Sequence, residues 1–317
     1  VALNATYTAT VNTTLGSMMS VSTMGISGKS GAQRNVAQYI DFYLLLDNSP
    51  SMGLAATAAD ISNMQRVANG CAFACHLLNN NGTENQNDNY NIARRNNIKL
   101  RIQVLRDAVA NLVESAKSSM SLAQQFRMEM WTFSDFQTRL IQLTTNLDQV
   151  KTASGQIDLA YSYQDQRDSQ TSYERAIARM TSTVPSSGSG VTPATPIRFL
   201  FFVTDGVQDT PIDGTMSNRS AGFQINNNRF ISAINPASCQ AMKDNNIKIG
   251  IIYTQYLPLY DNGFYNSYVR PFENNIGPLL KSCATDGLYF PVSTDGDINV
   301  AMQQLFSAAI ASVRITN

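Results

Sequence analysis

The feature that most constrains the fold of this chain is a set of short, almost unbroken apolar runs. Two of them are Y-I-D-F-Y-L-L-L at 39–46 and I-R-F-L-F-F-V-T-D-G at 197–206. A strand with one exposed face alternates apolar and polar residues, whereas a strand covered on both faces has no need to alternate. The runs I-K-I-G-I-I-Y-T at 247–254 and L-Y-F-P-V at 288–292 have the same character. We therefore expect these segments to be strands of a sheet that is covered on both sides.

Helical segments separate these strands. Residues 98–119 and 297–313 carry apolar side chains at helical spacing, and residues 126–134 alternate in the manner of a further strand. A third helix is expected after Thr171, which together with Glu174 would form a capping box. Strands that alternate with helices predict an α/β fold, here a doubly wound, mostly parallel, Rossmann-like sheet flanked by helices.

The start of the chain has a different pattern. Residues 1–11 alternate apolar with polar side chains and predict a half-buried strand, residues 17–27 predict a weaker strand, and residues 27–35 are typical of a linker. We therefore expect an N-terminal β-strand extension and linker over 1–37, followed by the α/β domain over 38–317. The strand and helix rhythm of that domain is interrupted by insertions at about 53–97, 207–246 and 255–275.

Oxygen-bearing side chains gather where the apolar runs end. Asp47, Ser49 and Ser51 follow one run, Asp205 ends another, and Thr171 precedes the helix that leads to it. In open α/β sheets the carboxyl ends of the strands lie at one edge, where ligands bind. Five hard oxygens from three loops suit Mg²⁺, and Mn²⁺ or Ca²⁺ would also accept them. A capped turn is the simpler explanation of the first loop alone, but not of all three together.

These three motifs resemble a known family. D-N-S-P-S-M, T-S-Y-E-R-A-I and F-L-F-F-V-T-D-G, in this order, are similar to the von Willebrand factor A (vWA) domain and its metal-ion-dependent adhesion site. The resemblance implies that Ser49, Ser51 and Thr171 contact a metal ion, and that Asp47 and Asp205 act directly or through water. It further implies a binding protein rather than an enzyme, in which the metal accepts an acidic side chain from a protein partner.

The chain has four cysteines, an even number that fits two disulfides in an oxidising compartment. We expect bonds between Cys71 and Cys75 and between Cys239 and Cys283. Two alternatives remain open: Cys71, Cys75 and the single histidine, His76, could bind zinc, or all four cysteines could form one cluster. His76 lies in an insertion rather than at a strand end, so a Ser-His-Asp hydrolase is not expected.

A narrower resemblance concerns C-A-F-A-C-H at 71–76, the remaining cysteines and the C-terminal L-F-S-A-A-I-A-S-V-R-I-T. These features are similar to TadG-like proteins of the tight-adherence (Flp) pilus machinery. The resemblance implies an extracytoplasmic location, pilus components or further copies of the chain as partners, and membrane attachment only through an anchor that this chain does not contain. Lys+Arg and Asp+Glu both number 23, so no basic excess is available for nucleic acid.

Two other functions remain alternatives. A structural subunit could assemble with itself through the N-terminal strand, because an unpaired strand edge can pair with another chain. A metal-dependent phosphohydrolase would also use carboxylates and Mg²⁺, but it needs more acidic ligands than these loops offer. The nearby acids Asp60 and Asp209 are expected to be solvated surface residues.

Overall fold

A computed structural model describes residues 2–13, 16–33, 37–163, 171–211, 222–225, 229–255, 263–293 and 296–314. The chain separates into two compact units, Val1–Ala37 and Gln38–Thr316.

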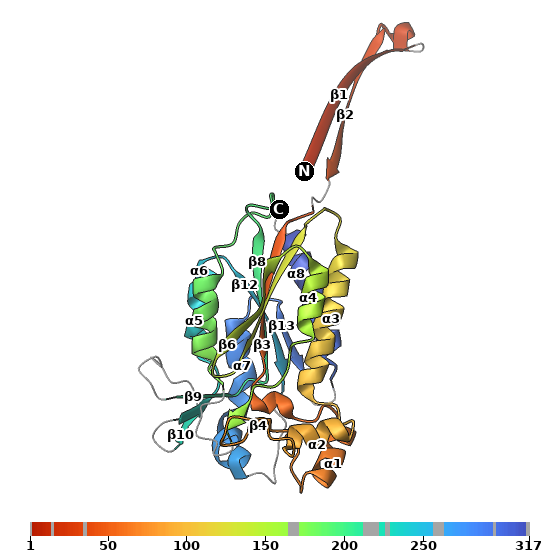
Figure 1. Ribbon diagram of the computed structural model, residues 1–317. Coiled ribbons are helices and arrows are strands. Elements are labelled where there is room, and N and C mark those ends of the chain that lie inside the picture. Colours follow the sequence, from red (N-terminus) through yellow and green to blue (C-terminus); the bar gives the residue numbers. More distant parts are fainter. Residues whose placement is uncertain are drawn as a thin grey trace. The chain divides into compact units, whose positions relative to one another are not determined.

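The larger unit is built on a six-stranded sheet (Figure 1). Its strands, in spatial order, are β13 (Tyr289–Val292), β12 (Lys248–Thr254), β8 (Ile197–Thr204), β3 (Ile40–Asp47), β5 (Phe126–Phe133) and β6 (Gln137–Thr144). All neighbouring strands are parallel except β5 and β6, which are antiparallel. The first strand of this sheet in the chain, β3, lies in its interior. The next strands, β5 and β6, lie on one side of β3, and the later strands β8, β12 and β13 lie on the other side. This order confirms the predicted doubly wound α/β fold.

Helices cover both faces of this sheet (Figure 1). One face packs against α3 (Arg101–Ser119), α4 (Leu147–Ser154) and α8 (Ile298–Arg314), and the other against α5 (Tyr173–Thr183), α6 (Gln240–Asp244) and α7 (Glu273–Cys283). In the described part of the chain, no helix has the length and hydropathy needed to cross a membrane.

Strand β3 shows why the central runs are apolar throughout. Phe42, Leu44 and Leu46 belong to the hydrophobic cluster on one face, whereas Tyr43 and Leu45 belong to the cluster on the other. Successive side chains of a strand point to opposite faces, so a strand between two cores must be apolar at every position.

One acid interrupts the apolar run of β3. Asp41 is buried opposite Arg127 of β5 and Arg198 of β8, and its carboxylate lies 2.7 Å from Arg127 Nε and 3.3 Å from Arg198 Nε. The two arginines compensate the buried charge, since an unpaired carboxylate inside the sheet would be costly.

The insertions contain their own elements. Residues 53–97 include α1 (Ala58–Val67), β4 (Leu77–Leu78) and α2 (Asn89–Arg95), and β4 pairs with β7 (Ser162–Tyr163). A small antiparallel sheet of β9 (Gln208–Pro211), β11 (Arg229–Ser232) and β10 (Gly222–Ile225) follows β8, and the short helix η3 (Pro236–Cys239) comes next. In the third insertion, η4 (Tyr265–Val269) and η5 (Arg270–Phe272) precede α7, and residues 256–262 lie outside the described residues.

The smaller unit is a two-stranded antiparallel hairpin. β1 (Ala2–Asn12) pairs along its whole length with β2 (Thr23–Gln33), and η1 (Gly16–Met19) lies between them. The prediction of a linker at 27–35 is therefore wrong for residues 27–33, because these residues continue β2 in register with β1. The prediction of a half-buried β1 is also wrong for its described side chains. Asn4 to Asn12 are exposed on both faces.

Of the two predicted disulfides, the structure contains the one between Cys239 and Cys283, whose Cα atoms are 5.6 Å apart. The predicted bond between Cys71 and Cys75 is absent, and both residues are free thiols. The backbone between them pairs with residues 53–55: Ala74 N–H donates to Gly53 O, and Ala55 N–H donates to Ala72 O. This pairing opposes the tight local turn that a disulfide between residues four apart would need.

Candidate metal centre

The loop after β3 folds back on the carboxylate that ends the strand. Asp47 is fully buried, and its Oδ1 accepts hydrogen bonds from Ser49 N–H at 2.9 Å and from Ser49 Oγ at 2.5 Å. Pro50 opens a short 3₁₀ helix, η2 (Pro50–Gly53), and Ser51 Oγ lies 2.9 Å from Ser49 Oγ. The proline has a fixed φ that suits the first turn of a helix. The loop therefore gathers one carboxylate and two hydroxyls.

The end of β8 brings a second carboxylate to the same place. The register pairs Leu46 with Val203, so that the residues after each lie side by side, and Thr204 Oγ1 donates to Asp47 Oδ2 at 2.8 Å. Asp205 follows directly and is fully buried. β3 and β8 are the strands at which the winding of the sheet changes direction, where ligands of such folds bind.

Gly206 allows the chain to turn immediately after Asp205. Its φ is +89°, and a Cβ at this position would lie 2.2 Å from Ile276 Cγ2. Val207 N–H then donates to Asp205 Oδ1 at 3.3 Å. A side chain at residue 206 would be strained by both the backbone conformation and the packing, so this position requires glycine.

The electrostatics of the two carboxylates favour a cation. Burial, followed by the charge of Asp205, raises the pKa of Asp47 from 3.8 to about 7. Burial also raises the pKa of Asp205, whereas its contact with Ser51 and the charge of Arg101 lower it. Asp205 Oδ2 is buried and has no hydrogen-bond partner among the described residues. A buried carboxylate oxygen without a partner is costly, and a bound cation would supply one. The residues present therefore fit a divalent metal.

Thr171 reaches this region through its backbone. Its N–H donates to Asp209 O at 3.0 Å, and Asp209 N–H donates to Thr171 O at 2.9 Å. The side chain is buried, and the bridge ties the loop before α5 to the segment that follows Asp205. Contacts thus join Asp47, Ser49, Ser51 and Asp205, whereas Thr171 is tied by its backbone to Asp209, which follows Asp205 in the chain.

The predicted capping box at Thr171 is wrong. The N-cap of α5 is Ser172, and Glu174 Oε1 accepts a hydrogen bond from Gln208 Nε2 at 2.9 Å. The bridge to Asp209 holds Thr171 in an extended conformation, so the helix begins later than the sequence pattern predicts. Thr171 is left outside the helix, where its hydroxyl is not used as a cap.

Asp209 is not the solvated surface residue that the sequence predicted. It is buried and forms an ion pair with Arg229 of β11. Burial raises the pKa of Asp209, and the Arg229 contact opposes that rise. The neighbouring arginine lies in the small sheet formed by the insertion, which a search for local sequence motifs does not detect.

Two further residues, which were not predicted from the sequence, shape the site. Thr204 donates to Asp47 through its hydroxyl, which also lies 2.6 Å from Tyr173 Oη. Asn48 donates from Nδ2 to Asp158 O at 3.0 Å, and its own carbonyl accepts from Ala160 N–H at 2.8 Å. Thr204 is signalled by its place directly before Asp205, whereas the contacts of Asn48 depend on a segment far away in the sequence.

The single histidine, His76, makes packing and hydrogen-bond contacts that fit a structural role. His76 is buried, its Nδ1 lies 3.1 Å from Asp88 Oδ2, and its ring packs at 4.1 Å between the rings of Tyr90 and Tyr161. Among the described residues, no group of three or more histidine, cysteine, aspartate or glutamate side chains is placed to hold a metal. The candidate centre therefore combines two carboxylates with hydroxyl groups.

Comparisons with known proteins support the fold. No family model matches the chain, and no curated protein matches it in sequence. Among solved structures, it is similar to the von Willebrand factor domain of the type V pili tip protein Mfa5 from Porphyromonas gingivalis. The two share 10% identity with a TM-score of 0.53, over 88% of this chain and 97% of that one.

Weaker similarities extend to two other proteins. The PilB minor pilin from Streptococcus sanguinis shares 10% identity with a TM-score of 0.48, over 93% of this chain and 70% of that one. Proximal thread matrix protein 1 from the mussel byssus, with a zinc-occupied adhesion-site motif, shares 12% identity with a TM-score of 0.47, over 87% of this chain and 49% of that one. The similarity to the Mfa5 domain supports the vWA fold, and at 10% identity it supports nothing finer.

Proposed function

We propose that this chain, which has the fold of a vWA domain, is a binding module that docks a protein partner through a divalent cation. Asp47, Ser49, Ser51, Thr171 and Asp205 would hold the cation, with Mg²⁺ the preferred ion and Mn²⁺ or Ca²⁺ as alternatives. In this proposal the protein is an adhesion or assembly component and not an enzyme.

The observation that carries the proposal is the buried, unpartnered Oδ2 of Asp205 beside the buried carboxylate of Asp47. Two buried acids at the switch point of the sheet, with hydroxyls from the loop after β3, form a site with few charges of its own. A phosphohydrolase would need more acidic ligands, and the described residues offer no cluster of three.

Each residue would have its own role at the proposed site. Ser49 and Thr204 hold the Asp47 carboxylate in place through hydrogen bonds, and Gly206 lets the backbone turn so that Asp205 remains directed into the site. Ser51 and Thr171 add neutral oxygens. When bound, the cation would supply an electrophilic position that a carboxylate of the partner can occupy.

We place this module outside the cytoplasm, in assembly of a tight-adherence (Flp) pilus or in surface attachment. The disulfide between Cys239 and Cys283 is compatible with an oxidising compartment, and the sequence features similar to TadG-like proteins favour the pilus. The fold is shared with a pilus tip protein, which is consistent with this setting. The partner would be a pilus component or another copy of the chain that presents an acidic side chain.

Titration calorimetry with Mg²⁺ tests the metal site directly. Asp47→Ala should abolish Mg²⁺ binding while circular dichroism shows an intact fold, because the substitution removes one of the two buried carboxylates. Asp244→Ala is the matched control, since it removes an exposed acid of α6 and should bind Mg²⁺ like the wild type. Unchanged Mg²⁺ affinity in Asp47→Ala would refute the proposed site.

A second function is supported by the hairpin. Tyr7, Val11, Met24 and Ile26 are exposed on one face of it, and the outer edges of β1 and β2 have no further strand in the described sheet. Such edges can pair with another chain, so the protein could be a self-assembling subunit of a surface filament or ring. Electron microscopy would favour this function if filaments persisted in EDTA and were lost when residues 1–37 were removed.

A further inference from the structure

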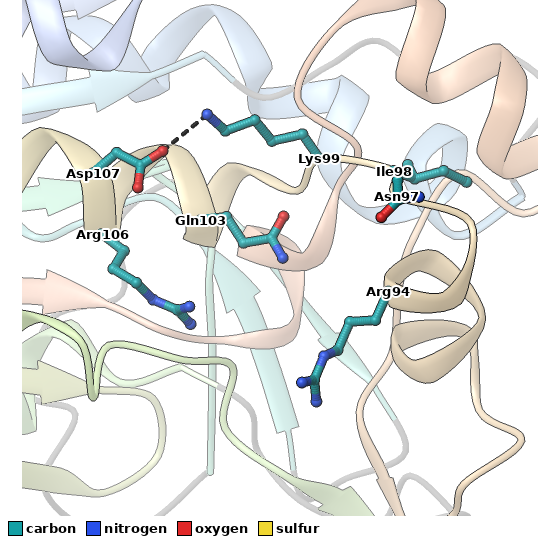
Figure 2. A pocket seen from close by; sticks show the side chains of 7 residues that line it. All are labelled: Arg94, Asn97, Ile98, Lys99, Gln103, Arg106 and Asp107. Atoms are coloured by element: carbon teal, nitrogen blue, oxygen red, sulfur yellow. Dashed lines mark hydrogen bonds and ion pairs between the residues drawn. The ribbon is translucent and has the colours of Figure 1, made fainter.

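A second site lies where α2 ends and α3 begins. A pocket of about 430 Å³ is lined there by Arg94 of α2, Lys99 of the connecting segment, and Gln103, Arg106 and Asp107 of α3 (Figure 2). Three of these side chains are cationic and one is acidic, although the chain as a whole has equal numbers of both kinds. The local excess of positive charge suggests an anionic ligand.

The cations differ in how far they are already compensated. Lys99 Nζ lies 2.8 Å from Asp107 Oδ2, and Arg106 lies 3.1 Å from the carboxylate of Asp158. Arg94 instead lies over the ring of Tyr90 at 5.6 Å, and within the described residues it forms no ion pair. The uncompensated charge of the pocket is therefore that of Arg94.

The polar groups converge on a common space. Figure 2 shows the guanidinium groups of Arg94 and Arg106 directed into the same part of the pocket, with the amide of Gln103 beside them. Gln103 Oε1 accepts from Leu100 N–H at 3.0 Å, which leaves its Nε2 as a donor for the pocket. Arg106 Nε donates to Ile157 O at 2.7 Å and its Nη2 lies 3.1 Å from Asp158 Oδ2, so the N–H groups of Nη1 remain for a ligand.

The pocket is connected to the candidate metal centre by a short segment. Arg106 contacts Ile157 and Asp158, and Asp158 O in turn accepts from Asn48, which lies between Asp47 and Ser49. α3 also begins at the carboxyl edge of the sheet, after the insertion that follows β3. A partner docked on the metal could therefore reach the pocket without leaving this edge.

We propose that this pocket binds a second carboxylate of the acidic protein partner, in addition to the one that docks at the metal. A guanidinium fork matches a carboxylate in bidentate geometry, and a pocket of this volume admits a side chain. The inference rests on the proposed function for the identity of the partner, whereas the pocket itself requires no metal.

The test measures binding of a short poly-L-glutamate peptide by fluorescence anisotropy, once with Mg²⁺ and once with EDTA. Arg94→Ala should weaken binding about tenfold in both conditions, because it removes charge-assisted hydrogen bonds. Arg94→Lys, which keeps the charge but loses the fork, should weaken it less. Arg95→Ala is the control: it lies on the same helix but outside the pocket lining, and should stay within about twofold of the wild type.

The outcomes separate the pocket from the metal site. Loss of the Mg²⁺-dependent part of binding in Asp205→Ala, with the Arg94 effect intact, supports both. An Arg94 effect without any Mg²⁺ dependence supports the pocket and contradicts the proposed metal function. Equal losses in Arg94→Ala and Arg95→Ala, or no binding of the peptide by the wild type, would overturn the pocket. Tighter, Arg94-dependent binding of a sulfated polysaccharide would overturn its assignment to a protein partner.

Discussion

At the scale of single residues, the surroundings of each carboxylate decide what it can do. Asp41 and Asp209 are buried beside arginines, which compensate their charge. Asp47 and Asp205 are buried beside one another, and the charge of Asp205 raises the pKa of Asp47. A buried aspartate is therefore structural where a guanidinium group faces it. It is a candidate metal ligand where a second carboxylate faces it.

The pH dependence of stability should reveal this acidic pair. Because burial and repulsion raise the pKa of Asp47 from 3.8 to about 7, the metal-free folded protein binds more protons than the unfolded chain in that window. The contribution of Asp47 to the free energy of unfolding therefore falls as the pH rises from 3.8 to about 7. Asp205→Asn removes the repulsion between the two carboxylates. The Tm of this variant in EDTA, measured relative to the wild type, should therefore increase between pH 5 and pH 8. The increase should be about 2–4 °C for each kcal/mol of repulsion that is removed.

Thermal unfolding followed by circular dichroism in EDTA checks this at several pH values. Asp244→Asn removes an exposed acid and should differ from the wild type by a constant amount. If the difference between Asp205→Asn and the wild type were also independent of pH, the two buried carboxylates would not be coupled.

Gly206 allows a prediction about the loop that carries Asp205. Gly206→Ala should destabilise the protein by about 2–4 kcal/mol, since it combines a positive φ with a clash against Ile276. Gly287→Ala is a matched control, because Gly287 has a φ of +77° but open space around it, and should cost only about 1–2 kcal/mol. Urea unfolding measures both. Equal losses would show that packing at Gly206 is unimportant.

At the scale of secondary-structure elements, local pairing determines which cysteines can meet. Cys239 ends η3 and Cys283 ends α7, so their disulfide joins two elements on the same face of the sheet. Cys71 and Cys75 belong to one segment that pairs with residues 53–55. Burial raises the pKa of the Cys75 thiol to about 11, which keeps it protonated and unreactive at neutral pH.

Removing the disulfide between Cys239 and Cys283 should lower the free energy of unfolding of the larger unit. The double variant Cys239→Ala, Cys283→Ala opens a loop with a sequence separation of 44, and the chain-entropy model gives a loss of roughly 3–4 kcal/mol. Urea unfolding measures the change. As a control, Cys71→Ala with Cys75→Ala removes no bond and should leave the same two cysteines oxidised. A thiol assay in urea that finds no free thiols in the wild type would contradict the cysteine assignment.

At the scale of the whole molecule, the chain comprises two units with different physical character. In the described residues, both hydrophobic clusters begin within β3, so the packed interior lies entirely in Gln38–Thr316. The hairpin of β1 and β2 exposes its side chains, and an isolated two-stranded hairpin is marginally stable in water. We therefore expect the larger unit to fold without the hairpin.

A chain that starts at Gln38 should retain the fold and its metal affinity. We expect the Tm and the Mg²⁺ affinity to match those of the full chain, because all five proposed ligands lie in the larger unit. Circular dichroism and titration calorimetry check this. Loss of a cooperative transition in the shortened chain would show that the hairpin is part of the folding unit.

The sequence by itself determined the architecture of this protein, because burial on two faces leaves a direct signature in each strand. The apolar run of β3 requires helices on both sides, and alternation with helices then predicts the parallel, doubly wound sheet. The same local logic identified Asp47 and Asp205 as neighbours, since consecutive motifs at strand ends meet at one edge of such a sheet.

Tertiary structure decided whatever depends on partners distant in the sequence. It moved the start of α5 past Thr171, buried Asp209 against Arg229, and left Cys71 apart from Cys75. It also brought Arg94 and Arg106 to one pocket from two helices. Hydrogen bonds, ion pairs and disulfides depend on distances in space, whereas a periodic pattern records only which face of an element is buried.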